Sequence, residues 1–221
     1  MKQRQYNLDK TAYDLEKENK RFIWKFFTYL YFLLFSLRNF KEIYIMCGII
    51  GFTGNLQAPG ILVDGLQQLE YRGYDSAGIA VNNGSETKIV KTTGKVATLR
   101  EKVEATADLA GTCGIGHTRW ATHGGVTEVN AHPHVSGNVT LIHNGIIENY
   151  KELAASLKTK GFTAISETDT EVAAMLIDSL YDGDPFAALK EADKALEGAY
   201  GFCVMFKDHP GEIYCMRNAS P

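Results

Sequence analysis

The chain has 221 residues, of which 45% are hydrophobic and 22% are charged, and its formal net charge is −3 at pH 7. This composition is typical of a globular protein, and it excludes a disordered chain and a strongly basic nucleic-acid-binding protein. The four cysteines show neither a disulfide framework nor paired metal-ligand spacing, which favours a reducing compartment. We therefore expect a cytoplasmic protein with no nucleic-acid partner.

The first 45 residues differ from the rest of the chain. They hold nine Lys and Arg against five Asp and Glu, and their longest charge-free apolar run covers residues 26–37. This run is shorter than the roughly 20 residues that a membrane-spanning helix needs, although a membrane anchor stays one interpretation. We favour a second one, in which residues 1–46 are an untranslated or removed leader. Lys41-Glu42 can be encoded by a ribosome-binding sequence, and it lies at the spacing expected before a start codon at Met46.

Short apolar runs bounded by turn residues predict eight strands in the remainder, at 48–53, 77–81, 88–92, 114–117, 140–143, 162–165, 199–206 and 213–216. Leucines at helical spacing predict one helix after Pro59 and another before Gly161, and a capping box of Thr168 and Glu171 predicts a third. Strands that follow one another without a helix between them favour an α+β fold of stacked, largely antiparallel sheets flanked by helices. The sequence ends directly after a predicted strand, so we expect one domain over residues 47–221, incomplete at its C-terminus.

The histidines include one candidate ligand pair, His132-Pro133-His134. Neither paired cysteines nor a His-Glu-x-x-His helix accompanies them, so a zinc site is the minor alternative, and we expect no metal and no cofactor. The apolar surroundings of the later cysteines predict core thiols at Cys113, Cys203 and Cys215.

Cys47 directly follows Met46, so it can become the N-terminal residue of a processed chain. Its thiol would then be a nucleophile, and its own α-amino group would be the adjacent base. An α-amino group titrates at about 7.7–8.0 and a free thiol at about 8.5, so the two can exchange a proton near neutral pH. The ordinary alternative is a buried thiol at the start of a core strand.

Further motifs rich in polar residues and glycine follow Cys47. They are Leu-Glu-Tyr-Arg-Gly-Tyr-Asp-Ser from Leu69, Gly-His-Thr-Arg-Trp-Ala-Thr-His-Gly from Gly116, Asn-Ala-His-Pro-His from Asn130, His-Asn-Gly from His143, and Ser-Glu-Thr-Asp-Thr-Glu from Ser166. Together with Cys-Gly-Ile-Ile-Gly from Cys47, they resemble, in the same order, the glutaminase domain of the glutamine–fructose-6-phosphate aminotransferase family. The resemblance covers residues 47–221 and implies the αββα sandwich of the N-terminal-nucleophile amidotransferases.

The resemblance assigns roles at five positions. Cys47 would attack the side-chain amide of L-glutamine, and the Asn144 side chain with the Gly145 backbone N–H would face the oxyanion that forms. Arg119 would hold the α-carboxylate of the substrate, and Asp169 would pair with its α-ammonium group. Each position also has an ordinary alternative: a turn at Asn144-Gly145, a surface ion pair at Arg119, and an acidic first-turn residue at Asp169.

The resemblance also places substrate-binding residues around the pocket. Trp120, Thr122 and His123 belong to a loop expected to close over the site, and Arg72 would brace the pocket together with the Asp75-Ser76 turn. Closure would keep the released ammonia away from water, in which it would be protonated.

The choice of acceptor separates this family from its relatives. The motifs around Arg72, His117 and Asn130 fit the sugar-phosphate enzyme better than amidophosphoribosyltransferase, glutamate synthase or asparagine synthetase. The resemblance implies that fructose 6-phosphate receives the ammonia in an isomerase domain that this sequence lacks, and that the full-length enzyme is a candidate homo-oligomer. The chain alone would at most hydrolyse glutamine. An inactive, membrane-tethered glutamine-binding module is the alternative from a different class.

Overall fold

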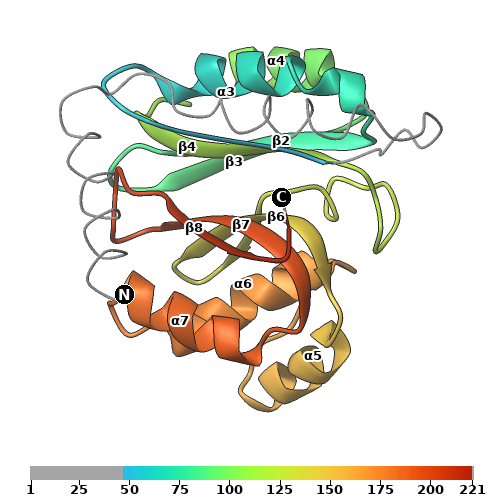
Figure 1. Cartoon of the computed structure of the whole chain (residues 1–221). Helices are drawn as coiled ribbons and strands as arrows, with labels where there is room; N and C mark the ends of the chain where they lie inside the picture. Colours follow the sequence, from blue (N-terminus) through green and yellow to red (C-terminus); the bar gives the residue numbers. More distant parts are fainter. Residues whose placement is uncertain (1–46, 221) are drawn as a thin grey trace, which may run out of the picture. The chain divides into compact units, whose positions relative to one another are not determined.

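Two four-stranded antiparallel sheets stack on each other, and helices cover their outer faces (Figure 1). The computed structural model describes residues 47–220, so the expectations of a leader and of a membrane anchor concern residues that lie outside the described ones. The layers follow the order helix, sheet, sheet, helix, which confirms the α+β sandwich expected from the sequence.

The first sheet has the strand order β1-β4-β2-β3. Its strands are β1 (Gly48–Thr53), β2 (Ser76–Asn82), β3 (Thr87–Thr93) and β4 (Cys113–Arg119). The helices on its outer face are α3 (Ala58–Gln67) and α4 (Val96–Ala105), and a 3₁₀ turn, η1 (Glu70–Arg72), follows α3.

The second sheet has the strand order β5-β6-β7-β8. Its strands are β5 (His134–Ser136), β6 (Val139–Ile147), β7 (Gly198–Phe206) and β8 (Tyr214–Asn218). The helices on its outer face are α5 (Tyr150–Thr159), α6 (Asp169–Leu180) and α7 (Pro185–Ala195) (Figure 1).

Three apolar clusters hold these layers together. One packs α3 and α4 on the first sheet through residues such as Leu62 and Leu99, and a larger one packs the second sheet on its helices. The third cluster lies between the sheets and consists of Ala80, Cys113, Ile115, Ile142, Cys203 and Met205. Each fully buried Leu, Ile or Phe side chain contributes about 1.5–3 kcal/mol, so burial on both faces of each sheet fixes the stack.

The alternation of side chains along β4 and β6 places polar groups between the sheets. Successive side chains of a strand point to opposite faces. Ile115 of β4 belongs to the inter-sheet cluster, so His117 and Arg119, two and four residues further on, lie on the same face. Ile142 of β6 likewise places Asn144 on the inter-sheet face. The apolar interface therefore continues into polar side chains.

Seven of the eight predicted strands are present, but the strand predicted at 162–165 is wrong. Backbone N–H groups of this segment donate hydrogen bonds to residues of the neighbouring helices instead of to another strand. The Phe162 N–H donates to the Leu157 carbonyl at the end of α5, at 3.1 Å, and the Ile165 N–H donates to the Glu171 carboxylate at 3.0 Å. The capping interaction of Thr168 is confirmed, since its side chain accepts the Glu171 N–H at 3.2 Å.

The structure also contains β5, α4 and α7, which the apolar patterns do not predict. β5 has three residues and is too short for a periodic signal. Helix α7 has a local signal of another kind, because Asp184 caps it by accepting the Ala187 N–H at 3.1 Å and Pro185 occupies its first turn.

The cysteines separate into two groups. Cys113 and Cys203 are buried, as the sequence predicts. The expectation of a core thiol is wrong for Cys215, which is exposed because it lies on β8, at the edge of the second sheet.

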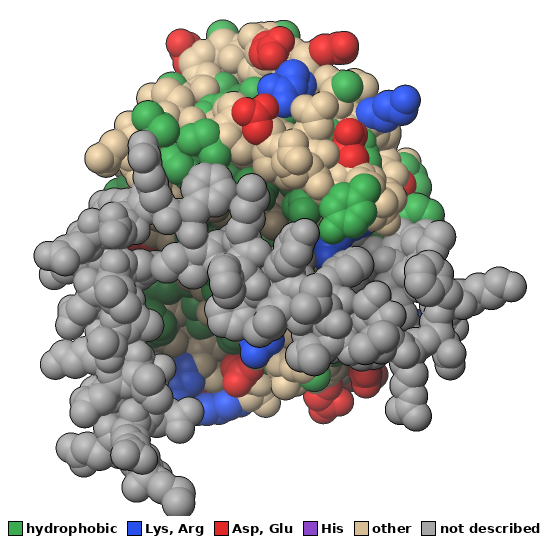
Figure 2. Space-filling model, turned by 45° about the horizontal axis from the view of Figure 1, so that its top comes forward, with side chains coloured by type: hydrophobic (Ala, Val, Ile, Leu, Met, Phe, Trp, Pro, Cys, Tyr) green, Lys and Arg blue, Asp and Glu red, His purple; other side chains and the backbone are tan. Residues whose placement is uncertain are grey.

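The part of the surface that is visible above the grey residues in Figure 2 carries acidic and basic side chains interspersed with apolar ones. One ion pair joins the outer helices, between Arg100 of α4 and Asp64 of α3, at 2.6 Å. Exposed pairs of this kind contribute at most about 1 kcal/mol, so this one adds little to the packing of the two helices. Within residues 47–220, no helix combines the length and the apolar character that crossing a bilayer requires.

Candidate active site

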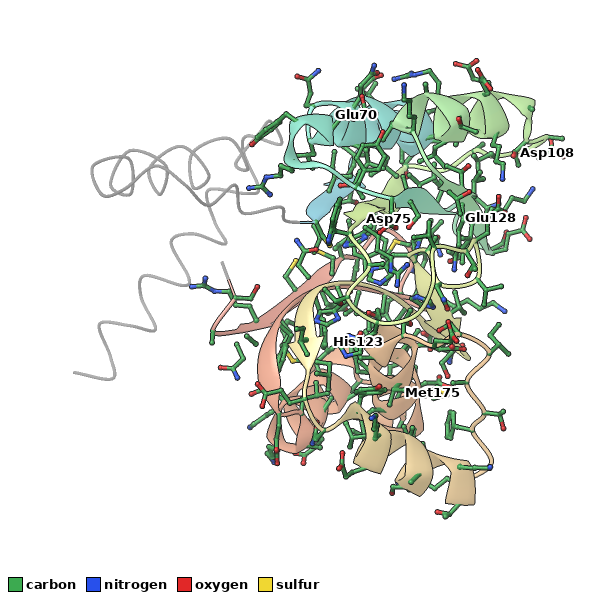
Figure 3. All side chains as sticks on the ribbon, turned by 90° about the vertical axis from the view of Figure 1, so that its right-hand side faces the viewer. Glu70, Asp75, Asp108, His123, Glu128 and Met175 are labelled. Atoms are coloured by element: carbon green, nitrogen blue, oxygen red, sulfur yellow. The ribbon has the colours of Figure 1, made fainter. Side chains whose placement is uncertain are left out.

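A cavity of about 300 Å³ opens where the interface between the sheets becomes polar. Eight of the nine residues expected at the site line it, namely Cys47, Arg119, Trp120, Thr122, His123, Asn144, Gly145 and Asp169. Figure 3 shows two residues of this region, Asp75 and His123, between the helical layers that Glu70 and Met175 mark. Arg72 is not part of the lining: it ends η1, and its guanidinium lies 6.0 Å from the centroid of the Tyr71 ring.

Cys47 lies directly before β1, with its side chain at the cavity. Its Sγ accepts a hydrogen bond from the Trp120 N–H at 3.1 Å. Burial raises the pKa of the Cys47 thiol, although the Trp120 N–H and the charge of Arg119 act in the opposite direction. A thiol with a raised pKa is protonated at neutral pH, so it needs a base before it can act as a nucleophile.

Asn144 and Gly145 approach Cys47 from the second sheet, on β6. The Asn144 Nδ2 donates to the Cys47 carbonyl oxygen at 3.0 Å. Gly145 has φ +134°, and a Cβ at this position would lie 2.0 Å from the Ala199 carbonyl oxygen on β7. Any larger residue would clash with this neighbouring strand, so the pair presents a side-chain amide and an unobstructed backbone to the cavity.

Arg119 ends β4, and its side chain is buried at the cavity. Its guanidinium donates to the carbonyl oxygens of His123 and of Gly125, and lies 3.9 Å from the Asp75 carboxylate. A guanidinium has five N–H donors, and these contacts leave donors for an anionic ligand in the cavity.

Asp169 is the first residue of α6 and is 4% exposed. Its Oδ2 accepts the Ile147 N–H at 2.9 Å and lies 3.9 Å from the His143 Nδ1. Burial lowers the pKa of His143 to about 4 despite the nearby carboxylate, so this imidazole is neutral at pH 7. Among the described residues, Asp169 forms no ion pair with Lys or Arg. Its carboxylate is therefore available to a cationic group of a ligand.

The loop after Arg119 borders the cavity with Trp120, Thr122 and His123. Trp120 is 43% exposed, and the His123 ring packs against the Tyr150 ring at 5.2 Å between centroids. The base of the loop is fixed by the Asp75 carboxylate, which accepts the Ala121 N–H.

A second clamp on the same loop comes from Asn130 and Glu167, two residues of the sequence motifs that were not expected at the site. The Gly125 N–H donates to the Glu167 carboxylate at 3.1 Å, and the Gly125 carbonyl accepts from the Asn130 side chain at 3.0 Å. Asn130 and Glu167 also bond to each other at 3.0 Å. The loop is therefore held at Ala121 and at Gly125, and the side chain of Trp120, directly before the first of these positions, is exposed.

No group of His, Cys, Asp or Glu side chains within residues 47–220 is arranged to hold a metal ion. The geometry that the cavity does offer is a thiol, amide donors, a guanidinium and a carboxylate. This set suits covalent chemistry on an amino acid that carries a side-chain amide.

Comparison with known proteins agrees with this geometry. Residues 117–220 match the glutamine amidotransferase domain family. The glutamine–fructose-6-phosphate aminotransferase (isomerizing) of Thermus thermophilus is 53% identical over 178 residues, which are 80% of this chain and 29% of that protein. The same enzyme of Idiomarina loihiensis is 51% identical over 180 residues, with the same two coverages. The chain thus spans less than a third of the length of these relatives.

The chain contains a glutamine amidotransferase domain, and this domain is similar to part of the glutamine–fructose-6-phosphate aminotransferases.

Solved structures confirm the fold of this amidotransferase domain. Glutamine phosphoribosylpyrophosphate amidotransferase from B. subtilis matches with a TM-score of 0.62 and 30% identity, over 72% of this chain and 35% of that one. A structure described as the allosteric regulatory enzyme of purine biosynthesis gives the same TM-score with 32% identity and the same coverages. The fold is therefore that of the N-terminal-nucleophile amidotransferases.

The amidotransferase domain also holds a group of buried histidines that the sequence reasoning left without a role. His132 and His143 line the cavity, and His117 and His134 lie behind it. The His117 and His132 rings stack at 4.1 Å, and the His132 and His134 rings meet edge to face at 5.0 Å. The period of two residues along β4, counted from Ile115, is a signal that places His117 on the inter-sheet face.

Proposed function

We propose that this domain hydrolyses L-glutamine to glutamate and ammonia at Cys47. In the whole protein, an isomerase domain outside this chain would use the ammonia to aminate fructose 6-phosphate. One observation carries the proposal: the Cys47 thiol, the Asn144 amide, the Arg119 guanidinium and the Asp169 carboxylate converge on a single cavity. These are the groups needed to attack a side-chain amide and to hold both charges of an amino acid.

The first half of the reaction forms a thioester. In a chain that begins with Cys47, the α-amino group takes the thiol proton, and the sulfur attacks the side-chain carbonyl carbon of glutamine. The oxygen of the tetrahedral intermediate then carries negative charge, which the Asn144 Nδ2 and the Gly145 N–H stabilise. The C–N bond breaks as the α-ammonium group returns a proton to the nitrogen, and ammonia leaves.

The second half regenerates the enzyme. The α-amino group takes a proton from water, and the resulting hydroxide adds to the thioester carbon, again with the oxyanion at Asn144 and Gly145. Collapse of this intermediate expels the Cys47 sulfur, which recovers a proton, and releases glutamate. Glutamine and water are consumed, and glutamate and ammonia are produced.

Substrate selection is assigned to two charges. Arg119 would bind the α-carboxylate with its remaining donors, and Asp169 would bind the α-ammonium group. Trp120, Thr122 and His123 would cover the bound substrate, and this cover would keep ammonia away from water. Arg72 would act only from outside the cavity lining, through the segment that leads to Asp75.

The acceptor is proposed from sequence identity. The glutamine–fructose-6-phosphate aminotransferases share 45–53% identity with this chain. The phosphoribosylpyrophosphate amidotransferase of B. subtilis shares 30%, so the sugar-phosphate acceptor is favoured over a phosphoribosyl acceptor. A cytoplasmic location, supported by the cysteine pattern, and a homo-oligomeric full-length enzyme belong to the same proposal.

The decisive experiment compares two N-termini. Protein whose first residue is Cys47 should release glutamate from glutamine, whereas protein with Met1 confirmed by mass spectrometry should not, because acylation of the Cys47 nitrogen removes its basicity. Equal glutaminase rates in the two forms would contradict the N-terminal-nucleophile mechanism. Glutamine binding without turnover in both forms would favour the binding-module alternative.

A further inference from the structure

We infer that His117 is a positioning residue for the reaction: its neutral imidazole, with the proton on Nε2, fixes the orientation of the Asn144 side-chain amide. The inference rests on the proposed function, because it assigns His117 to the oxyanion site of that reaction.

The hydrogen bonds of Asn144 determine which end of its side-chain amide faces Cys47 and which end faces His117. The Asn144 Nδ2 lies 3.0 Å from the Cys47 carbonyl oxygen, which can only accept a hydrogen bond, so the NH₂ end of the amide must face Cys47. The other end, Oδ1, then lies 2.9 Å from the His117 Nε2. An amide oxygen can only accept, so Nε2 must carry the proton. A rotation of the amide by 180° would place two acceptors against each other at Cys47.

The burial of His117 restricts it to this role. The side chain is fully buried and does not line the cavity, and within residues 47–220 its one side-chain hydrogen bond is the one to Asn144. Its Nδ1 has no hydrogen-bond partner among residues 47–220. A second proton there would be a buried, unsatisfied donor beside Arg119, so the imidazole stays neutral with one proton.

The ring is held in place from behind. Gly78 lies opposite His117 in the ladder between β2 and β4, and a Cβ on Gly78 would lie 2.3 Å from the His132 carbonyl oxygen. Because Gly78 has no side chain, the backbone at His132 can pack directly on the face of the sheet at this point. The His132 ring can then stack on the His117 ring with centroids 4.1 Å apart. The ring that directs Asn144 thus has little freedom to rotate.

The first test uses the full chain and needs no activity. Nitrogen-15 NMR of the His117 ring, assigned by comparison with H117Q, should show the neutral Nε2–H tautomer at pH 7. The Nδ1–H tautomer or an imidazolium at that pH would overturn the inference. This result does not depend on glutamine turnover, so a failure of the proposed glutaminase function is distinguishable from a failure of the inference.

The second test uses two replacements of similar size in the Cys47-first form. H117Q keeps a donor near the Nε2 position and should keep kcat within a few-fold. H117M keeps the volume but removes the donor. It should lower kcat about 10–100-fold, a fall no larger than the one caused by losing a whole oxyanion donor, and KM should stay within about threefold. Equal losses in both variants, or a loss confined to KM, would contradict a positioning role.

A double-mutant cycle separates positioning from packing. In an N144A background, the amide that His117 orients is gone, so adding H117M should not lower kcat further. Additive losses would show that His117 acts through the general structure, and would overturn the inference. Circular dichroism and melting temperature of each variant verify that the comparison is made between folded proteins.

Discussion

Cys47 is the residue on which the proposed covalent step depends. Changing Cys47 to Ala removes the nucleophile, and we expect glutamine hydrolysis to fall to background. A glutamine analogue with an electrophile at the side-chain carbonyl should modify one thiol only, as peptide mapping by mass spectrometry would show. C113A is the matched control, because Cys113 is a buried thiol of the inter-sheet cluster and lies outside the cavity lining. An adduct on Cys113, Cys203 or Cys215 would refute the assignment.

Arg119 and Asp169 should determine affinity for the two charged ends of glutamine. Truncating one partner of a buried, hydrogen-bonded charge pair costs about 2–5 kcal/mol, which corresponds to a rise in KM of about 30-fold or more. We expect this rise for R119A and for D169A, measured by steady-state kinetics or as Kd by calorimetry. R119K tests the geometry: it keeps the charge but loses the fork of donors that also holds the His123 and Gly125 carbonyls. Normal glutamine binding in both Ala variants would disprove the proposed role.

At the scale of an element, the N-terminus of α6 carries both a helix cap that stabilises the fold and the site residue Asp169. The Thr168 hydroxyl accepts the Glu171 N–H at 3.2 Å and lies 3.1 Å from the His134 Nε2, and Asp169 follows directly. We expect T168A to lower the free energy of unfolding by about 1 kcal/mol, and T168S to keep most of it, since serine caps equally well. Urea denaturation measures both. Identical midpoints for T168A and the unmodified chain would show that the cap contributes nothing.

Much of the fold was predictable from sequence because buried strands and leucine-faced helices leave periodic patterns. The failures have local causes. Residues 162–165 are apolar enough for a strand, but the Glu171 carboxylate, six residues from Ile165, takes the Ile165 N–H that a strand would need. Helix α4 buries only Val96 and Leu99, so its apolar face is too narrow to predict it from periodicity. For α7, the Asp184-Pro185 start is a capping signal that hydrophobicity alone does not reveal.

In the site, the lining residues were predictable from sequence, whereas the residues that support them were not. The residues that line the cavity could be named from motifs, because each motif carries an unusual group at a strand end or a helix start. Residues that support the lining, such as His117 and Glu167, could not be named, because their importance depends on partners more than 25 positions away. Arg72, which the motifs also named, is not part of the cavity lining, and its role as a brace stays a prediction.

At the scale of the whole molecule, the buried histidines should make stability depend on pH. Burial lowers the pKa of His117 to about 3 and that of His143 to about 4, and it lowers the pKa values of His132 and His134 well below 6.5. The unfolded chain therefore binds more protons than the folded chain below pH 6.5. This stability is present above pH 6.5 and is lost as the pH falls toward 4.

For His117 and His143, the loss of stability should be on the order of 2 kcal/mol each at pH 5 relative to pH 8. Urea midpoints at the two pH values measure the total, and H143Q, which cannot be protonated, should reduce the difference. A midpoint that does not change between pH 8 and pH 5 would contradict the prediction that these side chains are neutral in the folded state.

The division of the site between two sheets has one more consequence. Arg119 ends a strand of the first sheet and Cys47 directly precedes another, whereas Asn144 lies on the second sheet. The contact of Asn144 with the Cys47 carbonyl therefore crosses the interface between the sheets. A slide of one sheet past the other by a single residue, about 3.3 Å, would break this contact and leave every hydrogen bond within each sheet intact. The rate of turnover would then depend on how the two sheets are aligned with each other, which circular dichroism does not detect. Activity would be lost in a state that keeps its full secondary structure.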